Sequence, residues 1–517
     1  MDQLELIKID NLNKISDFSK EELVREYELI QNKNQILKDE ITRLARENYD
    51  LRQIQISDEQ LKLISEEQLA LLYQSMYGAS SERYKKPVNQ DKEKKQNPSK
   101  PRVKKPSERY PQLPVREVIL TTNPAPACDA CGKEMSDSGM TEDSEQLTVI
   151  PKKYEIILYK RSIYRCSCHS CMKTSPVPAK IIEGSTYSNE MILDVVLSKY
   201  CDLIPIERYA QMAARGGVID LPPHSLIDLT HKFAFFVKPV YQLIKNGILK
   251  ARVLNADETP HRMLEGSEKK SWYLWGFSSP TLSFLECHDT RSGDVASDIL
   301  INSTCEILVS DVYSGYNKAI RIANVERQAA QKILILNANC NAHARRYFFK
   351  TRIHYQEAFF YLDHYHEIYK LNSQAKGKPP DEILDLRSKM KSHFEAMKAK
   401  AMEELPRYPN GNQYRKALGY FLENYTGLTI FLSDPDVPID NNAQERLLRS
   451  HVVGRKTWYG THSEQGAETA SILFSIVETC KLNDINPREY FQKLVQDLLD
   501  KKNPYTPFDY KTTKSSS

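Results

Sequence analysis

Three acidic residues are candidates for metal-dependent chemistry. Asp257 follows the apolar residues of "ARVLNADE", and Asp311 follows a second apolar run, "CEILVSD". Carboxylates at the ends of buried strands are costly unless something binds them. Two together repel each other, and bound Mg²⁺ removes that conflict because it prefers hard oxygen ligands. The third acid of a two-metal site is Glu445, on a predicted helix whose start Asp440 can cap.

The elements that carry these acids follow an informative order. After Lys250 the sequence predicts three strands, a helix over "GDVASDILINS", the strand that ends at Asp311, and a fifth strand at "KILILNANC". Three strands, a helix and a fourth strand is the order of the ribonuclease-H-like fold, in which the first and fourth strands are neighbours. We therefore expect Asp257 and Asp311 at one edge of the sheet, with Glu258 pointing to the opposite face from Asp257.

The N-terminal segment has the pattern of a coiled coil. Apolar residues recur at strict seven-residue spacing at Leu23, Ile30, Leu37, Leu44 and Leu51. The intervening core positions include asparagines, which favour a two-stranded form. The pattern predicts a homodimer, with a single amphipathic helix lying on its own protein as the alternative.

A basic linker and a cysteine cluster follow. Between Arg83 and Lys105 there are ten Lys or Arg and two acidic residues, in a segment typical of disorder. Two C-x2-C pairs then supply four thiolates, which fits one structural Zn²⁺, and the alternating stretch between them predicts the strands of a ribbon. The ligands expected are Cys128, Cys131, Cys168 and Cys171; Cys166 is an alternative to Cys168, and His169 is adjacent. The remaining cysteines are interpreted as small buried apolar residues: Cys201, Cys287, Cys305, Cys340 and Cys480.

Two further regions are predicted to be helical. Residues 188–250 predict helices on either side of Gly216-Gly217, the outline of a helix-turn-helix DNA reader or of any small helical bundle. Residues 351–433 lie between Asp311 and Glu445 and predict an all-α insertion.

These motifs resemble those of the IS66 family of insertion-sequence transposases, members of the DDE superfamily, over nearly the whole chain. The likeness is carried by "DETP" at Asp257, "DVYSGY" at Asp311, "CNAHARRYF" from Cys340, "DNNAQER" from Asp440, "GRKTW" from Gly454 and "TCKLNDINPREYF" from Thr479. The resemblance implies that Asp257, Asp311 and Glu445 are the catalytic DDE triad. The sequence departs from the family at Asn341, where Trp is usual and a change in packing alone is expected, and in the extra cysteine of "CSCHSC".

The resemblance also implies a reaction and its partners. Two Mg²⁺ ions would serve a water that frees a 3′-hydroxyl at the element's end, and then the attack of that hydroxyl on target DNA. Companion proteins encoded by the same element are implied as further partners. Positively charged residues are expected to bind DNA phosphates: His343, Arg345, Arg346, Arg446, Arg449, Arg455 and Lys456.

Two other functions are compatible with the residues. A catalytically idle DNA-binding regulator should have lost one of the three acids, and all three are present. A Mg²⁺-dependent nuclease or resolvase would cut without joining, and a strand-transfer assay separates it from a transposase.

The chain is thus predicted to be a multidomain α+β protein, cytoplasmic and associated with the nucleoid. The start "MDQLELIKIDN" is not a signal peptide, and no apolar run approaches the length of a membrane span. The expected parts are a coiled coil at 18–77, a basic disordered linker at 78–112, a zinc ribbon at 113–182, a helix-turn-helix-like region at 188–250, a ribonuclease-H-like core at 251–350 and 434–475, an all-α insertion at 351–433 and a C-terminal segment at 476–517.

Overall fold

The computed structural model describes most of the chain after residue 104. It covers residues 105–515 with gaps at 121–125, 128, 131, 136–143, 151, 166–170 and 266–270, and a few helical pieces between residues 31 and 47. Of the predicted coiled-coil stripe only Ile41 and Leu44 are described, both in helix, so the predicted dimer lies outside the described residues. The same holds for every predicted zinc ligand except Cys171, which is exposed.

The chain divides into two compact units. The smaller consists of Arg83–Tyr159 and Gly216–Val218, and its described residues contain the short helix α3 (Pro106–Arg109) and one isolated bridge. The apolar residues at 147–158 were predicted to form strands of a ribbon, but those described here form none. Their side chains are exposed, Ile156 to 96%. Without a facing layer to bury them, nothing holds such residues in a sheet.

The larger unit is built around a five-stranded mixed sheet. Its order is β5-β4-β3-β6-β7, and the parallel pairing of β3 with β6 confirms that the first and fourth strands of the sheet are neighbours. The strands are β3 (Val253–Arg262), β4 (Ser271–Ser278), β5 (Ser283–His288), β6 (Ile307–Ser310) and β7 (Leu336–Asn339). A two-stranded hairpin, β1 (Ile163–Arg165) with β2 (Met172–Thr174), also belongs to this unit.

One expectation about the first strand is wrong. Asp257 does not end β3, which continues antiparallel to β4 as far as Arg262. Only the pairing of β3 with β6 stops before Asp257, at Asn255 with Val309. The acid therefore lies where β3 extends beyond its parallel neighbour, which leaves room on that side of the strand.

The β5 edge of the sheet is covered by helix α15 (Glu464–Leu482). Backbone N–H groups of Ser283, Leu285 and Cys287 donate to the hydroxyls of Thr479, Ser475 and Ser471 at 2.8–3.1 Å. These hydroxyls recur every four residues on the helix, whereas the N–H groups recur every two residues on the strand, so each turn of α15 meets one free donor. This arrangement protects an edge that would otherwise be open to another strand.

The helices before the sheet share the core with those at the C-terminus. Helix α5 (Ile206–Arg215) ends before Gly217, whose φ of 94° suits glycine, and α6 (Pro223–Leu249) begins at Pro223 as the sequence predicts. Helix α6 packs against α15, and α4 (Asn189–Tyr200) packs against α6 and α16 (Pro487–Leu499). Residues 189–249 are thus joined to the sheet and not separate from it. A last helix, α17 (Pro507–Ser515), contacts α15.

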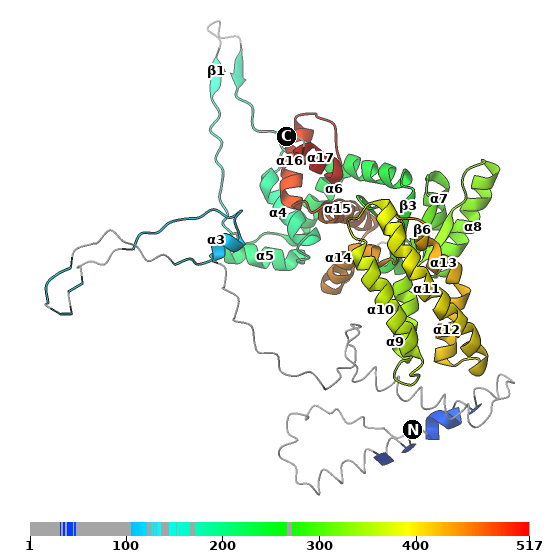
Figure 1. Ribbon diagram of the computed structural model, residues 1–517. Coiled ribbons are helices and arrows are strands. Elements are labelled where there is room, and N and C mark those ends of the chain that lie inside the picture. The colour runs from blue at the N-terminus through cyan, green and yellow to red at the C-terminus, as the bar shows by residue number, and fades with distance from the viewer. Residues whose placement is uncertain are drawn as a thin grey trace. The chain divides into compact units, whose positions relative to one another are not determined.

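Helices α7 (Asp294–Asn302) and α8 (Ser314–Ala329) pack together (Figure 1). Tyr316 of α8 meets the ring of Trp275 of β4 edge-on at 5.8 Å. Helix α14 (Asn442–Trp458), which carries Glu445, packs against β3 and β4. Trp275 and Gly276 are consecutive in β4, so they face opposite sides of the sheet. Helix α8 contacts Trp275 and helix α14 lies against Gly276, so the two helices cover opposite faces.

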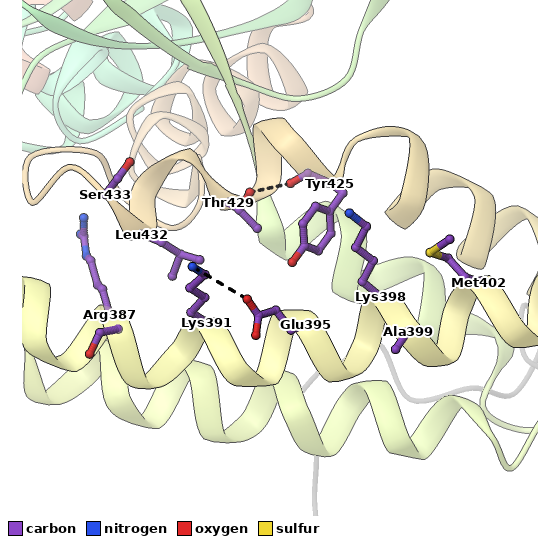
Figure 2. A pocket seen from close by; sticks show the side chains of 11 residues that line it. Arg387, Lys391, Glu395, Lys398, Ala399, Met402, Tyr425, Thr429, Leu432 and Ser433 are labelled. Atoms are coloured by element: carbon purple, nitrogen blue, oxygen red, sulfur yellow. Dashed lines mark hydrogen bonds and ion pairs between the residues drawn. The ribbon is translucent and has the colours of Figure 1, made fainter.

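Between β7 and α14 the chain is helical. The elements are α9 (Asn341–Thr351), α10 (Ala358–Gln374), α11 (Pro380–Glu404), η2 (Leu405–Arg407), α12 (Gln413–Glu423), α13 (Tyr425–Thr429) and η3 (Ile430–Leu432). Aromatic rings fill their core, among them Phe348 stacked on Tyr361 at 4.1 Å. Helix α11 and the segment from α13 to η3 flank a surface pocket of about 720 Å³ (Figure 2). Lys391, Lys398 and Tyr425 line this pocket, and none of the candidate site residues does.

The described helices include none with the length and apolar character required to cross a bilayer.

Candidate active site

The three predicted acids come together at one edge of the sheet. Asp257 points from β3, Asp311 follows the last residue of β6, and Glu445 lies in the first turn of α14. Burial, and then the negative charges of Glu258, Asp311 and Glu445, raise the pKa of Asp257 to about 8. Asp257 therefore feels both of the other acids, although they are 54 and 188 positions away in sequence.

A glycine lets α14 approach closely enough to bring Glu445 to this edge. Gly276 of β4 is paired with Asp257, so both face the same side of the sheet. A Cβ placed on Gly276 would lie 2.2 Å from Nε2 of Gln444 and about 3 Å from Leu448. A larger residue would therefore overlap the side chains of Gln444 and Leu448, which lie on α14 next to Glu445.

Amide side chains attach the start of α14 to β3. Asn441 donates from Nδ2 to the carbonyl of Ala256, the residue before Asp257, at 2.8 Å. Its Oδ1 accepts from Asn255 at 2.8 Å. Asp440 accepts the N–H of Asn442 at 3.1 Å, close to the capping role expected, and also the hydroxyl of Tyr369 at 2.9 Å. The motif "DNNAQER" thus fixes the position of Glu445 through the residues before it.

The geometry fits divalent cations. Oδ1 of Asp257 accepts the N–H of Glu258 at 2.9 Å, and Oδ1 of Asp311 accepts that of Tyr313 at 3.1 Å. Within the described chain no Lys or Arg forms an ion pair with Asp257, Asp311 or Glu445. Oε1 of Glu445 is buried and has no hydrogen-bond partner there. Partly buried carboxylates from three elements, with no basic side chain of the described residues paired to them, are the donor set that hard cations take.

Glu258 has a more specific role than the sequence indicated. As expected, its side chain lies on the opposite face of β3, where Arg291 donates to Oε1 at 2.7 and 2.9 Å and Tyr316 donates to Oε2 at 2.6 Å. Arg291 also lies over the ring of Tyr313, 4.1 Å from its centroid. Glu258 therefore joins "DETP" to "DVYSGY", which places Asp311 beside Asp257. Its partners lie far away in sequence, so no local pattern could have identified this link.

A buried pair of histidines joins β3 to α14. Nδ1 of His261 on β3 is 3.2 Å from Nε2 of His451, and Nε2 of His261 is 2.8 Å from the hydroxyl of Thr461. Burial, and then the charge of Arg455, lowers the pKa of His261 to about 4. Burial, and then His261, also lowers the pKa of His451. Both rings are neutral near pH 7, and sequence analysis had singled out neither.

The basic residues lie on two helices. His343, Arg345 and Arg346 belong to α9, and His343 Nε2 is 3.8 Å from Glu445 Oε1. On α14, Arg446, Arg449 and Lys456 are exposed. Arg455 donates to the carbonyl of Pro260 on β3, so part of its charge is already engaged.

Comparison with known proteins identifies the family. The model of the transposase IS66 family matches residues 184–469, a span that contains all three acids. This chain belongs to the IS66 transposase family. Three uncharacterized proteins of Sinorhizobium fredii are similar to it: y4hP (25% identical, covering 77% of this chain and 74% of that protein), y4qI (26%, 73% and 71%) and y4jD (25%, 75% and 77%).

The departure from the IS66 pattern at Asn341 changes more than packing. The residue is fully buried, and its Nδ2 donates to the carbonyls of Leu428 and Ile439 at 2.9 and 3.0 Å. Its Oδ1 accepts from Tyr365 at 3.4 Å. Asn341 therefore anchors the chain as it returns from the helical region toward α14, which an indole with one N–H cannot do in the same way.

Proposed function

We propose that this protein is a DDE transposase that cuts the ends of an insertion sequence and joins them to target DNA. The observation that carries the proposal is the convergence of Asp257, Asp311 and Glu445. Burial and then the neighbouring negative charges raise the pKa of Asp257 to about 8. Perturbed carboxyl groups that meet from distant elements, without an arginine or lysine to neutralise them, are typical of metal-dependent active sites.

The strand order supports the type of core. An order of β5-β4-β3-β6-β7 in which only β4 runs antiparallel to the other strands is the arrangement expected of a ribonuclease-H-like sheet. Asp257 lies on the central strand β3, Asp311 directly follows the neighbouring strand β6, and Glu445 lies on the later helix α14. We assign the helical residues 351–433 as an insertion into this core.

The chain's own residues would divide the work as follows. Asp257, Asp311 and Glu445 would hold two Mg²⁺ ions. Such ions supply activation of an attacking water or 3′-hydroxyl and stabilisation of the leaving oxygen at a phosphodiester. Glu258, Asn441 and Gly276 keep the three carboxylates in place.

The basic residues of α9 and α14 would position the DNA. Arg446, Arg449 and Lys456 present exposed charges on the helix that carries Glu445, so a strand bound there lies next to the acids. Such phosphate contacts orient DNA without reading its sequence. Sequence recognition, pairing of two protomers through residues 18–77 and binding of one Zn²⁺ by the N-terminal cysteines remain part of the proposal, as does association with the nucleoid.

The test compares Asp311→Asn with Asp298→Asn, an exposed carboxylate on α7 of the same unit. Asp311→Asn should abolish Mg²⁺-dependent cleavage and joining of a DNA carrying the element's end, with unchanged DNA binding, while Asp298→Asn keeps all three. Joining by Asp311→Asn at the unaltered rate would refute the assignment. Cleavage without any strand transfer in the unaltered protein would favour a nuclease or resolvase.

A further inference from the structure

A second cluster of metal-ligating side chains shares Glu445 with the acidic site. Cys340 immediately precedes α9, His343 lies in its first turn, and Glu445 lies in the first turn of α14. One ligand atom from each lies within 4.8 Å of the others. Three donors at this separation can surround a single ion, because metal–ligand distances of about 2.0–2.3 Å place ligands of one ion about 3–4 Å apart.

The atoms of this cluster are not satisfied by the protein. Nδ1 of His343 and Oε1 of Glu445 are buried and have no hydrogen-bond partner among the described residues. The distance of 3.8 Å between His343 Nε2 and Glu445 Oε1 is too long for a hydrogen bond. Buried polar atoms without partners are rare in folded proteins and usually indicate a missing ligand or water.

The sulfur of Cys340 is suitably placed to act as a ligand. The thiol is fully buried, which raises its pKa to about 12, and its Sγ accepts the N–H of Asn441 at 3.2 Å, a contact that offsets part of this shift. It lies at the N-terminus of α9, where the helix dipole stabilises negative charge. The contact with Asn441 also connects this sulfur to the residue that holds α14 on β3.

We propose that Cys340, His343 and Glu445 bind a transition metal ion such as Zn²⁺, and that this ion inhibits the enzyme by withdrawing Glu445 from Asp257 and Asp311. Sulfur, nitrogen and oxygen donors with an open fourth position suit Zn²⁺ or Co²⁺, whereas Mg²⁺ avoids sulfur. A carboxylate bound to this ion is no longer available to complete the acidic site. The inhibition rests on the proposed function; the binding does not.

Binding is tested on the full chain with Co²⁺ as the spectroscopic probe. Cys340→Ser keeps an acceptor for the N–H of Asn441, and His343→Ala removes the imidazole while leaving the thiol. Each should bind one Co²⁺ fewer per chain than the unaltered protein, and Cys340→Ser should lose the thiolate-to-cobalt absorption of this site. The predicted N-terminal cysteine ligands are intact in every variant, so difference spectra isolate the new site.

Cys305→Ser is the matched control. Cys305 is also a fully buried thiol of the larger unit, and it belongs to no cluster of potential ligands among the described residues. This variant should bind Co²⁺ as the unaltered protein does. Unchanged Co²⁺ stoichiometry and absorption in both Cys340→Ser and His343→Ala would overturn the proposed site.

Inhibition is tested by titrating Zn²⁺ into cleavage reactions at fixed Mg²⁺. Cys340→Ser should keep Mg²⁺-dependent cleavage and require at least tenfold more Zn²⁺ for half-inhibition, while Cys305→Ser remains as sensitive as the unaltered protein. Equal sensitivity of all three proteins would overturn the inhibitory role. Cleavage that survives Asp311→Asn would instead contradict the proposed function and leave the Co²⁺ result standing.

Discussion

Replacing Asp257 by Asn should stabilise the metal-free protein while it abolishes catalysis. The carboxyl is mostly buried, and three neighbouring acids add to the penalty for ionising it. The unfolded chain releases this proton near pH 3.8, whereas the native state keeps it until about pH 8. Because the native state binds more protons between these values, stability falls as pH rises from about 4 to about 8.

The size of the effect follows from the same values. Each pH unit between 3.8 and 7 costs about 1.4 kcal/mol, so the carboxyl lowers the stability of the metal-free native state by about 4 kcal/mol at pH 7. Asn has nearly the same shape and no charge, although an amide hydrogen without an acceptor costs about 1–3 kcal/mol. We expect Asp257→Asn to gain about 1–3 kcal/mol, which is a urea midpoint higher by up to about 1 M.

Tryptophan fluorescence is a suitable assay because all three tryptophans of the chain belong to β4 and α14, two elements that build the site. Trp272 and Trp275 belong to β4, and Trp458 is the last residue of α14. Urea unfolding in EDTA at pH 8 should show the higher midpoint, and the difference should shrink with falling pH and reverse near pH 4, where only the cost of the amide remains. Added Mg²⁺ should stabilise the unaltered protein far more than the variant, since only the former has the complete ligand set.

The control for this experiment is Asp298→Asn, which removes an exposed carboxylate from the same unit. Its midpoint should match that of the unaltered protein at every pH. If Asp257→Asn were no more stable than the unaltered protein in EDTA at pH 8, the acids would not be crowded as the structure indicates.

Three more predictions concern the supports of the site and its basic surface. Gly276→Ala should lower stability by about 1–3 kcal/mol and reduce strand transfer more than DNA binding, because the added Cβ overlaps the buried side chain of Gln444 next to Glu445; equal activity measured in a transfer assay would contradict this role. His451→Gln should reduce the loss of stability between pH 6.5 and 4, because the native state excludes protons that an unfolded histidine binds; urea midpoints across this range test it. Replacing Arg446 and Arg449 together by Ala should weaken DNA binding and reduce the slope of log K against log salt by about 2, and an unchanged slope would rule out both as phosphate ligands.

The sequence predicted the parts of the site that depend on local pattern. Apolar runs indicated where β3 and β6 lie, and the acids after these runs, Asp257 and Asp311, were predicted as two of the three site residues. The strand order then placed these acids at a common edge. The sequence did not show that β3 continues to Arg262, because the residues after Asp257 are polar and are held in the strand by pairing with β4. Such pairing between segments is not visible in the pattern of either one.

The residues missed by sequence analysis act through distant partners. Cys340 was interpreted as a small apolar residue, and it is buried as expected. Its sulfur also lies close enough to His343 and Glu445 for the three side chains to bind one metal ion. His261 and His451 are 190 positions apart and meet only because α14 crosses β3. Asn341 was expected to affect packing alone, whereas its amide bonds to two carbonyls that follow the helical region.

The side chains that hold the candidate active site together are mostly neutral, and their neutrality has a physical consequence. Asn255 and Asn441 hold α14 on β3 by amide hydrogen bonds, and a glycine provides the close approach. The nearby cation Arg291 is directed to Glu258 on the other face of the sheet. An arginine or lysine bound directly to Asp257 or Asp311 would lower the repulsion between them and compete with metal ions for the same oxygens. Because Arg291 is directed to Glu258 and the acids pair with no arginine or lysine in the described chain, the fold holds them in place without neutralising them. In the proposed function their repulsion would favour the binding of divalent cations.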